Sequence, residues 1–189
     1  MLLYTLLGTG IIFFIIIGWY IKTHNSFVLK KNRVKQCESG ICVALKQRND
    51  MIPNLVTAVK AYMNFENETL TRVAELRSQA DKATDEQTQI RLGGQLSAAL
   101  PGIKAVIEQY PQLKANEQFV RLESSIEEME MQLQAIRRTY NAAVVSFNNY
   151  VEMFPSSIVA GMKNYTTMQL IDIPETEKQN VDVNSLFVS

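Results

Sequence analysis

Apolar and polar residues are distributed along this chain in two patterns, one in residues 1–21 and another beyond them. Residues 1–21 carry no charged side chain. Beyond them, apolar residues recur at steps of three and four, the spacing that places side chains on one face of an α-helix. No segment alternates with a period of two, as a half-buried strand does. The pattern predicts an all-α protein in which an N-terminal transmembrane helix continues into an antiparallel bundle of long helices.

The uncharged segment, residues 1–21, is long enough to cross a bilayer, because about 20 apolar residues rising about 1.5 Å each span the hydrocarbon core. Trp19 and Tyr20 at its end fit the aromatic belt of a membrane interface. A cleaved secretory signal would begin with basic residues and end at a small-residue cleavage site, and this segment has neither. We therefore expect an uncleaved, single-pass anchor.

A run of cations follows the anchor before the first acid, Glu38. This basic collar consists of Lys22, Lys30, Lys31, Arg33 and Lys35. Since positive charge stays on the cytoplasmic side, we predict the N-terminus outside the cell and residues 22–189 inside. The collar is also a candidate contact for anionic lipid headgroups, with a role in topology alone as the alternative.

Two long apolar seams dominate the rest of the chain. The later one predicts a single helix from about Gln112 to Pro155, with Leu122, Ile126, Met129, Leu133, Ile136, Tyr140, Val144, Phe147, Val151 and Phe154 on its apolar face. The earlier one follows the anchor directly, from Phe27 to Tyr62, with a kink or short break expected at Pro53. No Gly- or Ser-rich linker separates anchor from bundle, so α-helical structure is expected to run on between them.

Shorter helices are predicted at residues 66–83, 86–100 and 103–109, with Pro101-Gly102 breaking the last two apart. Apolar residues between 156 and 169 share one helical face, which would lie on the membrane, on a neighbouring subunit or back on its own bundle. The expected division is an anchor at 1–21, a bundle at 22–155, an amphipathic helix at 156–171 and a flexible tail at 172–189.

Composition and motifs exclude several function classes. The formal net charge is zero, so nucleic acid is not an expected partner. Cys37 and Cys42 are interpreted as small apolar residues, and the single histidine, His24, excludes a site with two imidazoles. Metalloprotease, hydrolase and nucleotide-binding motifs are absent, and Glu127, Glu128 and Glu130 are interpreted as a solvated helix face. We predict no enzymatic activity, no cofactor and no metal.

Three short strings resemble a known family. Residues 45–56 read LKQRNDMIPNLV, similar to the LKRRxDLIPNLV signature of the LemA family of bacterial membrane proteins. Residues 110–115 read YPQLKA, and residues 138–141 read RTYN, with the later pair Phe154-Pro155; these resemble the family's YPxLKA, RxYN and FP elements. Cys42 departs from the family's usual aspartate, Met51 from its leucine, and Leu170-Ile171 from its C-terminal aromatic pair.

The resemblance implies a helical bundle of bacterial origin that is anchored in the cell (inner) membrane and has no catalytic residues or cofactors. Members of the family are associated with envelope homeostasis, including membrane zinc metalloproteases of the HtpX type, and a related branch belongs to magnetosome membranes. We expect a non-enzymatic scaffold or adaptor that contacts membrane lipids and positions a membrane partner, such as that protease or another component of envelope homeostasis. Because an anchor helix that continues into the bundle would hold neighbouring copies upright at one height, we also expect homo-oligomers. A membrane-shaping bundle and a ligand-sensing bundle are the alternatives.

Four polar residues lie beside the apolar seams, where a helical core does not require them: Arg48, Asn54, Asn141 and Asn148. We hypothesise that they form one buried polar network near Pro53, which satisfies freed backbone groups and fixes the helix register.

Overall fold

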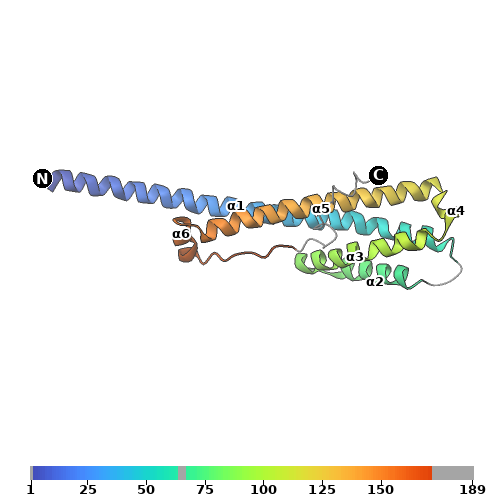
Figure 1. Cartoon of the computed structure of the whole chain (residues 1–189). Helices are drawn as coiled ribbons and strands as arrows, with labels where there is room; N and C mark the ends of the chain where they lie inside the picture. Colours follow the sequence, from blue (N-terminus) through green and yellow to red (C-terminus); the bar gives the residue numbers. More distant parts are fainter. Residues whose placement is uncertain (1, 64–66, 172–189) are drawn as a thin grey trace, which may run out of the picture. The chain divides into compact units, whose positions relative to one another are not determined.

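The structure, a computed structural model, describes residues 2–63 and 67–171, and all regular structure in those ranges is helical (Figure 1). The predicted all-α class is therefore confirmed. The helices are α1 (Leu2–Lys60), α2 (Glu68–Lys82), α3 (Glu86–Ile107), α4 (Pro111–Lys114), α5 (Glu117–Glu152) and α6 (Ser156–Lys163). The tail predicted at 172–189 lies outside the described residues.

The first helix, α1, runs without interruption for 59 residues. Among the described residues it is the one helix long and apolar enough to cross a membrane, and none of its apolar window is buried. Pro53 lies inside it, so the short break considered there does not occur. Proline removes one backbone hydrogen bond, but Ile52 and Leu55 on either side are both buried, and their packing outweighs that loss.

A second proline, Pro101, also lies within a helix. The sequence predicted two helices separated there, whereas α3 continues through it to Ile107. Buried Leu96 precedes this proline and buried Ile103 follows it, so both sides are held in the same core. Hydrophobic packing again decides the outcome over local helix preference.

The long late helix begins later than predicted. The chain forms the separate short helix α4 at Pro111, and α5 starts at Glu117 rather than near Gln112. Asn116 supplies the reason, because its Oδ1 accepts hydrogen bonds from the backbone N–H groups of Gln118 at 2.9 Å and Phe119 at 3.2 Å. This is the N-cap arrangement that fixes the first residue of a helix.

Side chains also cap the two shorter helices. Asn67 Oδ1 accepts the Thr69 N–H at 2.9 Å before α2, and Asp85 Oδ1 accepts the Thr88 N–H at 2.7 Å before α3. The hydrogen bond from Thr88 holds the pKa of the Asp85 carboxyl below its usual value, because it stabilises the ionised form. These caps fix the starts of α2 and α3 at Glu68 and Glu86, close to the predicted starts at residues 66 and 86.

The described chain divides into two compact units. Unit 1 joins Met1–Cys37 to Thr139–Ile171, and unit 2 contains Glu38–Arg138. Each unit therefore receives part of α1 and part of α5. A single bundle was predicted for residues 22–155, whereas these residues are divided between the two units.

Unit 2 packs its parts of α1 and α5 against the hairpin of α2 and α3. Gly40 lies against Ile136, and Arg48 pairs with Glu130, so the two long helices are antiparallel here. The core of this unit is formed by buried residues of α1, α2, α3, α4 and α5. They are Ile52, Leu55, Val59, Leu70, Val73, Leu76, Ala80, Leu92, Leu96, Ile103, Val106, Ile107, Leu113, Phe119 and Ile126.

Unit 1 holds its helices together with aromatic rings. The ring of Phe27 in α1 lies 4.7 Å from that of Tyr150 and 6.2 Å from that of Phe147 in α5, measured between centroids. Tyr165, beyond α6, stacks on Phe27 at 4.8 Å. Lys30 Nζ donates to Ser146 Oγ at 2.7 Å. These pairs place α1 and α5 antiparallel in this unit as well.

The C-terminal part of unit 1 differs from its prediction. A helix was expected over residues 156–171, but α6 ends at Lys163. Asn164 adopts the left-handed conformation, with φ 52° and ψ 39°, that terminates many helices. Residues 165–171 then follow without regular secondary structure.

Candidate functional site

The most constrained polar side chain of unit 2 is Arg48, which projects from α1 and is 0% exposed. Its Nη1 donates to Ser97 Oγ at 2.7 Å and to Glu130 Oε1 at 2.6 Å, and its Nη2 donates to the carbonyl of Gly93 at 3.2 Å. Ser97 also donates to the carbonyl of Gly93, at 3.1 Å. One guanidinium thus connects α1, α3 and α5, as a planar group with several donors can.

A glycine brings α1 and α3 close enough for this connection. A Cβ atom at Gly93 would lie 2.4 Å from Cδ2 of Leu45, well inside contact distance. The missing side chain lets the backbone of α3 approach α1, and the same approach places the Gly93 carbonyl within reach of Arg48. No motif in the sequence indicates this role for Gly93.

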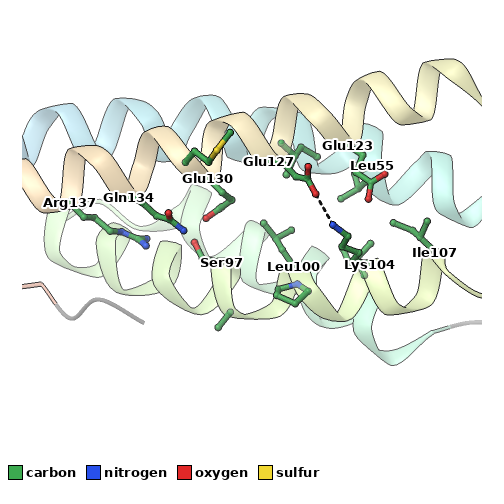
Figure 2. Close-up of a pocket in the computed structure, with 15 residues that line it drawn as sticks. Leu55, Ser97, Leu100, Lys104, Ile107, Glu123, Glu127, Glu130, Gln134 and Arg137 are labelled. Atoms are coloured by element: carbon green, nitrogen blue, oxygen red, sulfur yellow. Dashed lines mark hydrogen bonds and ion pairs between the residues drawn. The ribbon is translucent and has the colours of Figure 1, made fainter. Parts of the chain in front are cut away.

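Beside the arginine lies an open groove of 620 Å³ between α3 and α5, which Leu55 of α1 also lines (Figure 2). Its lining is mainly apolar. The residues are Leu55, Ser97, Ala98, Leu100, Pro101, Ile103, Lys104, Ile107, Glu123, Ile126, Glu127, Glu130, Met131, Gln134 and Arg137. A volume of about 300 to 1,000 Å³ is usual for small-molecule sites, and an apolar groove also suits a partner helix.

Ion pairs involve two of the groove's carboxylates. Lys104 Nζ lies 2.9 Å from Glu127 Oε1, the contact drawn in Figure 2, and this carboxylate raises the pKa of Lys104. Glu130 is held by Arg48. The hydroxyl of Ser97 is engaged with Arg48 and Gly93, so it is not paired with a base as a nucleophile would be. Ser97 is therefore not an activated nucleophile, and the surface that the groove exposes is mainly apolar.

The four residues of the hypothesised polar network are not joined into one network. Arg48 binds groups of unit 2, whereas Asn141 and Asn148 bind backbone of unit 1. Asn54 is exposed, because the apolar face of α1 at this point is formed by Ile52 and Leu55. Arg48 is buried as the hypothesis required, but its partners are different ones.

Each of the two asparagines holds one residue of the extended segment, residues 165–171. Asn148 Nδ2 donates to the Met168 carbonyl at 2.9 Å, and its Oδ1 accepts the Met168 N–H at 2.8 Å. Asn141 makes the same pair of bonds to Ile171, at 2.9 and 3.0 Å. A side-chain amide here replaces the backbone amide of a neighbouring strand, so the segment lies along α5 without forming a sheet.

The basic collar remains on the surface of unit 1. Lys22, Lys31, Arg33 and Lys35 are exposed. Lys30 is half-buried, donates to Ser146 and lies 5.4 Å above the ring of Tyr150. Lys31 Nζ lies 6.0 Å from the ring of Tyr165. Lys30 therefore has a protein partner in addition to any lipid contact.

Two further side chains depart from the sequence analysis. Glu130 is not part of a solvated face, because it is half-buried against Arg48, whereas Glu127 and Glu128 are exposed. Its position between Ile126 and Leu133 at the edge of the seam was the available signal. Phe154, assigned to the seam, is 80% exposed because α5 ends at Glu152.

The fold and the groove define a class: all-α proteins in which one continuous helix is both a candidate membrane span and a core helix of the bundle. The chain belongs to the LemA family, whose profile matches residues 37–185. A protein named Protein LemA from Metamycoplasma hominis (strain ATCC 23114 / DSM 25592 / NBRC 14850 / NCTC 10111 / PG21) is similar. It is 27% identical over 186 residues, which cover 98% of this chain and 83% of that relative.

Proposed function

We propose that this protein is a non-enzymatic scaffold or adaptor that is anchored in a bacterial cytoplasmic membrane, assembles with copies of itself and positions a membrane partner. The observation that carries the proposal is the continuity of α1. The helix starts in an uncharged segment with exposed apolar side chains and goes on to supply core residues, Phe27 in unit 1 and Ile52 in unit 2. No linker separates the anchor from the folded part, which suits a role in holding a partner at the membrane.

The proposed topology places the N-terminus outside and the bundle in the cytoplasm, because the basic collar follows α1's apolar segment. Two reporters fused after Ser189 test it. A reporter active only in the cytoplasm should be active, and one that requires export should be inactive. The reverse pattern would place the bundle outside the cell and overturn the orientation.

For the partner, the family resemblance suggests a membrane zinc metalloprotease of the HtpX type, and the groove supplies a surface for its apolar segment. Met131 lines the groove and is 61% exposed, whereas the neighbouring Gln132 is exposed outside it. A photo-crosslinking residue at position 131, introduced into the full chain in its native membrane, should yield a discrete adduct with a membrane protein. The same probe at position 132 should not, and equal labelling from both positions would contradict partner binding in the groove.

A small-molecule ligand is the second candidate, favoured by the volume and apolar lining of the groove. Native mass spectrometry of the protein released from its membrane would detect a bound compound. Ala98→Trp fills the groove and should remove such a mass, whereas Ala105→Trp, an exposed position of α3 outside the groove, should retain it. A stoichiometric compound with this behaviour would favour a sensor over an adaptor.

A further inference from the structure

Exposed apolar side chains gather in unit 1 where α5 ends and α6 begins. Met153, Phe154, Ile158 and Met162, called here the turn patch, are 61%, 80%, 51% and 66% exposed. The opposite face of α6 is already packed, because Ser156, Val159 and Ala160 are buried. The turn patch is therefore the outward side of this element, where a helix facing water normally presents polar residues.

The position of the turn patch along α1 follows from the contacts within unit 1. Lys30 contacts Ser146 and Phe27 contacts Tyr150. The two helices therefore run antiparallel, and a step toward the end of α5 corresponds to a step of about the same length toward the start of α1. Phe154 comes four residues after Tyr150, about 6 Å further along the axis if the helical rise is extended. This places it near the level of Thr23, which is 4% exposed and so is covered at this point.

That level is also where the character of α1 changes. Its uncharged stretch ends with Trp19, Tyr20 and Ile21, and Lys22 is the first charged side chain. In a membrane-spanning helix such a sequence marks the boundary between hydrocarbon and headgroups. The turn patch thus lies beside the part of α1 that would emerge from the bilayer.

We propose that the turn patch is a lipid-binding surface, which enters the interfacial region of the leaflet from which α1 emerges. This inference rests on the membrane anchoring in the proposed function. Apolar side chains at the boundary between headgroups and acyl chains bury surface without crossing the membrane. Lys163 at the end of α6 and Lys22 on α1 supply positive charge beside them for anionic headgroups, while Glu152 is the exposed acid at the end of α5.

Quenching of tryptophan by brominated lipids tests the proposal in the full-length protein. The chain contains one tryptophan, Trp19, which reports on α1 itself. In a Trp19→Phe background, Phe154→Trp and Met162→Trp each place the probe in the turn patch, and both positions are largely exposed. The matched control is Val145→Trp, an exposed apolar position of α5 that lies about 10 Å before the end of that helix at Glu152.

Each protein is reconstituted in nanodiscs of phosphatidylcholine and phosphatidylglycerol, with bromine near the upper end of the acyl chains. We expect lipid bromination to remove most of the emission at positions 154 and 162 and little of that at 145. Emission at 154 and 162 that bromine leaves unchanged would overturn the lipid surface. If those probes are at the same time shielded from aqueous acrylamide, a protein surface covers the patch instead.

The wild-type protein separates this inference from the proposed function. Quenching of Trp19 without quenching at 154 and 162 refutes the turn patch alone and leaves the anchor in place. Failure to quench Trp19 refutes the anchor, and the lipid surface with it. Equal quenching at 145 and 154 also overturns the proposal, because the membrane contact would then not be confined to the turn.

Discussion

Polar side chains next to the apolar seams bind backbone groups of neighbouring segments. Arg48 donates to the Gly93 carbonyl, and Asn141 and Asn148 pair with the backbone of Ile171 and Met168. Buried backbone groups without partners are costly, so such bonds stabilise one arrangement of segments over others. The asparagines therefore position a segment that has no secondary structure of its own.

The substitution Arg48→Met should strongly destabilise unit 2. It leaves Glu130 beside the core without its cation, and Glu130 keeps only 18% of its side-chain surface in water. Breaking a buried ion pair costs about 3 to 5 kcal/mol of folding free energy. Because Glu130 is partly exposed, we expect a loss of about 3 kcal/mol. Chemical denaturation in detergent, followed by circular dichroism, measures this loss.

The double substitution Arg48→Met with Glu130→Leu provides the control. Removing both charges should recover most of the lost stability, because neither group is then left unpaired. A double variant as unstable as Arg48→Met alone would show that the arginine acts through its bonds to Ser97 and Gly93 instead.

Truncation of Phe147 should be among the most damaging single changes in unit 1. This ring is 1% exposed and packs edge-to-face on Phe27 and Tyr165, so Phe147→Ala should cost about 3 to 5 kcal/mol. Glu128→Ala changes an exposed side chain and should cost a few tenths of a kcal/mol, as surface substitutions usually do. Equal melting temperatures for the two variants would show that the seam is wrongly assigned.

The burial of these residues was predictable from the sequence, but their partners were not. Phe147, Ile126 and Leu133 are buried as predicted. Their burial could be predicted because helical periodicity is a local pattern in the sequence. The partners of Arg48 come 45, 49 and 82 residues later, and local spacing carries no information about which helix packs where. The same reason explains why the groove between α3 and α5 was not foreseen.

At the scale of elements, helix types were predicted more accurately than helix ends. The predicted starts of α2 and α3, at residues 66 and 86, lie close to the observed starts at Glu68 and Glu86, whereas the breaks considered at both internal prolines do not occur. The segment after Asn164 was predicted as helix because its apolar residues share a helical spacing. Tertiary bonds from Asn141 and Asn148 hold it extended instead, and the sequence of the segment itself contains no sign of them.

The asparagine pairs give a prediction for this extended segment. Asn148→Ala removes both bonds to Met168, so the amide of Met168 should exchange its hydrogen for deuterium faster, while amides in the middle of α5 remain protected. Hydrogen–deuterium exchange with mass spectrometry measures both in one sample.

Asn148→Asp is the matched control, because it retains the acceptor for the Met168 N–H and loses the donor to the carbonyl. Its exchange should fall between that of the original protein and that of Asn148→Ala. Unchanged exchange in both variants would mean that packing of Tyr165 alone holds the segment.

At the scale of the whole molecule, the proposed homo-oligomer can be tested by measuring the molecular mass of the protein. A shared membrane reduces the search between identical bundles and raises their effective concentration, so weak contacts suffice and cyclic closure is the usual result. Light scattering in mild detergent should show a multimer for the full chain and a smaller species for a chain that begins at Asn25. Monomers in both cases, at concentrations above those in the membrane extract, would refute assembly.

The continuity of α1 also sets the order of events during synthesis. Phe27 leaves the ribosome about 120 residues before Phe147, the ring on which it packs. At about 5 to 20 residues per second, the apolar side of α1 remains without its partner for about 6 to 24 s. Throughout that interval a newly inserted chain would display a hydrophobic seam at the membrane surface. Chaperones or the bilayer itself would cover this seam until α5 is made. Depletion of ribosome-associated chaperones should lower the yield of this protein in the first case and leave it unchanged in the second.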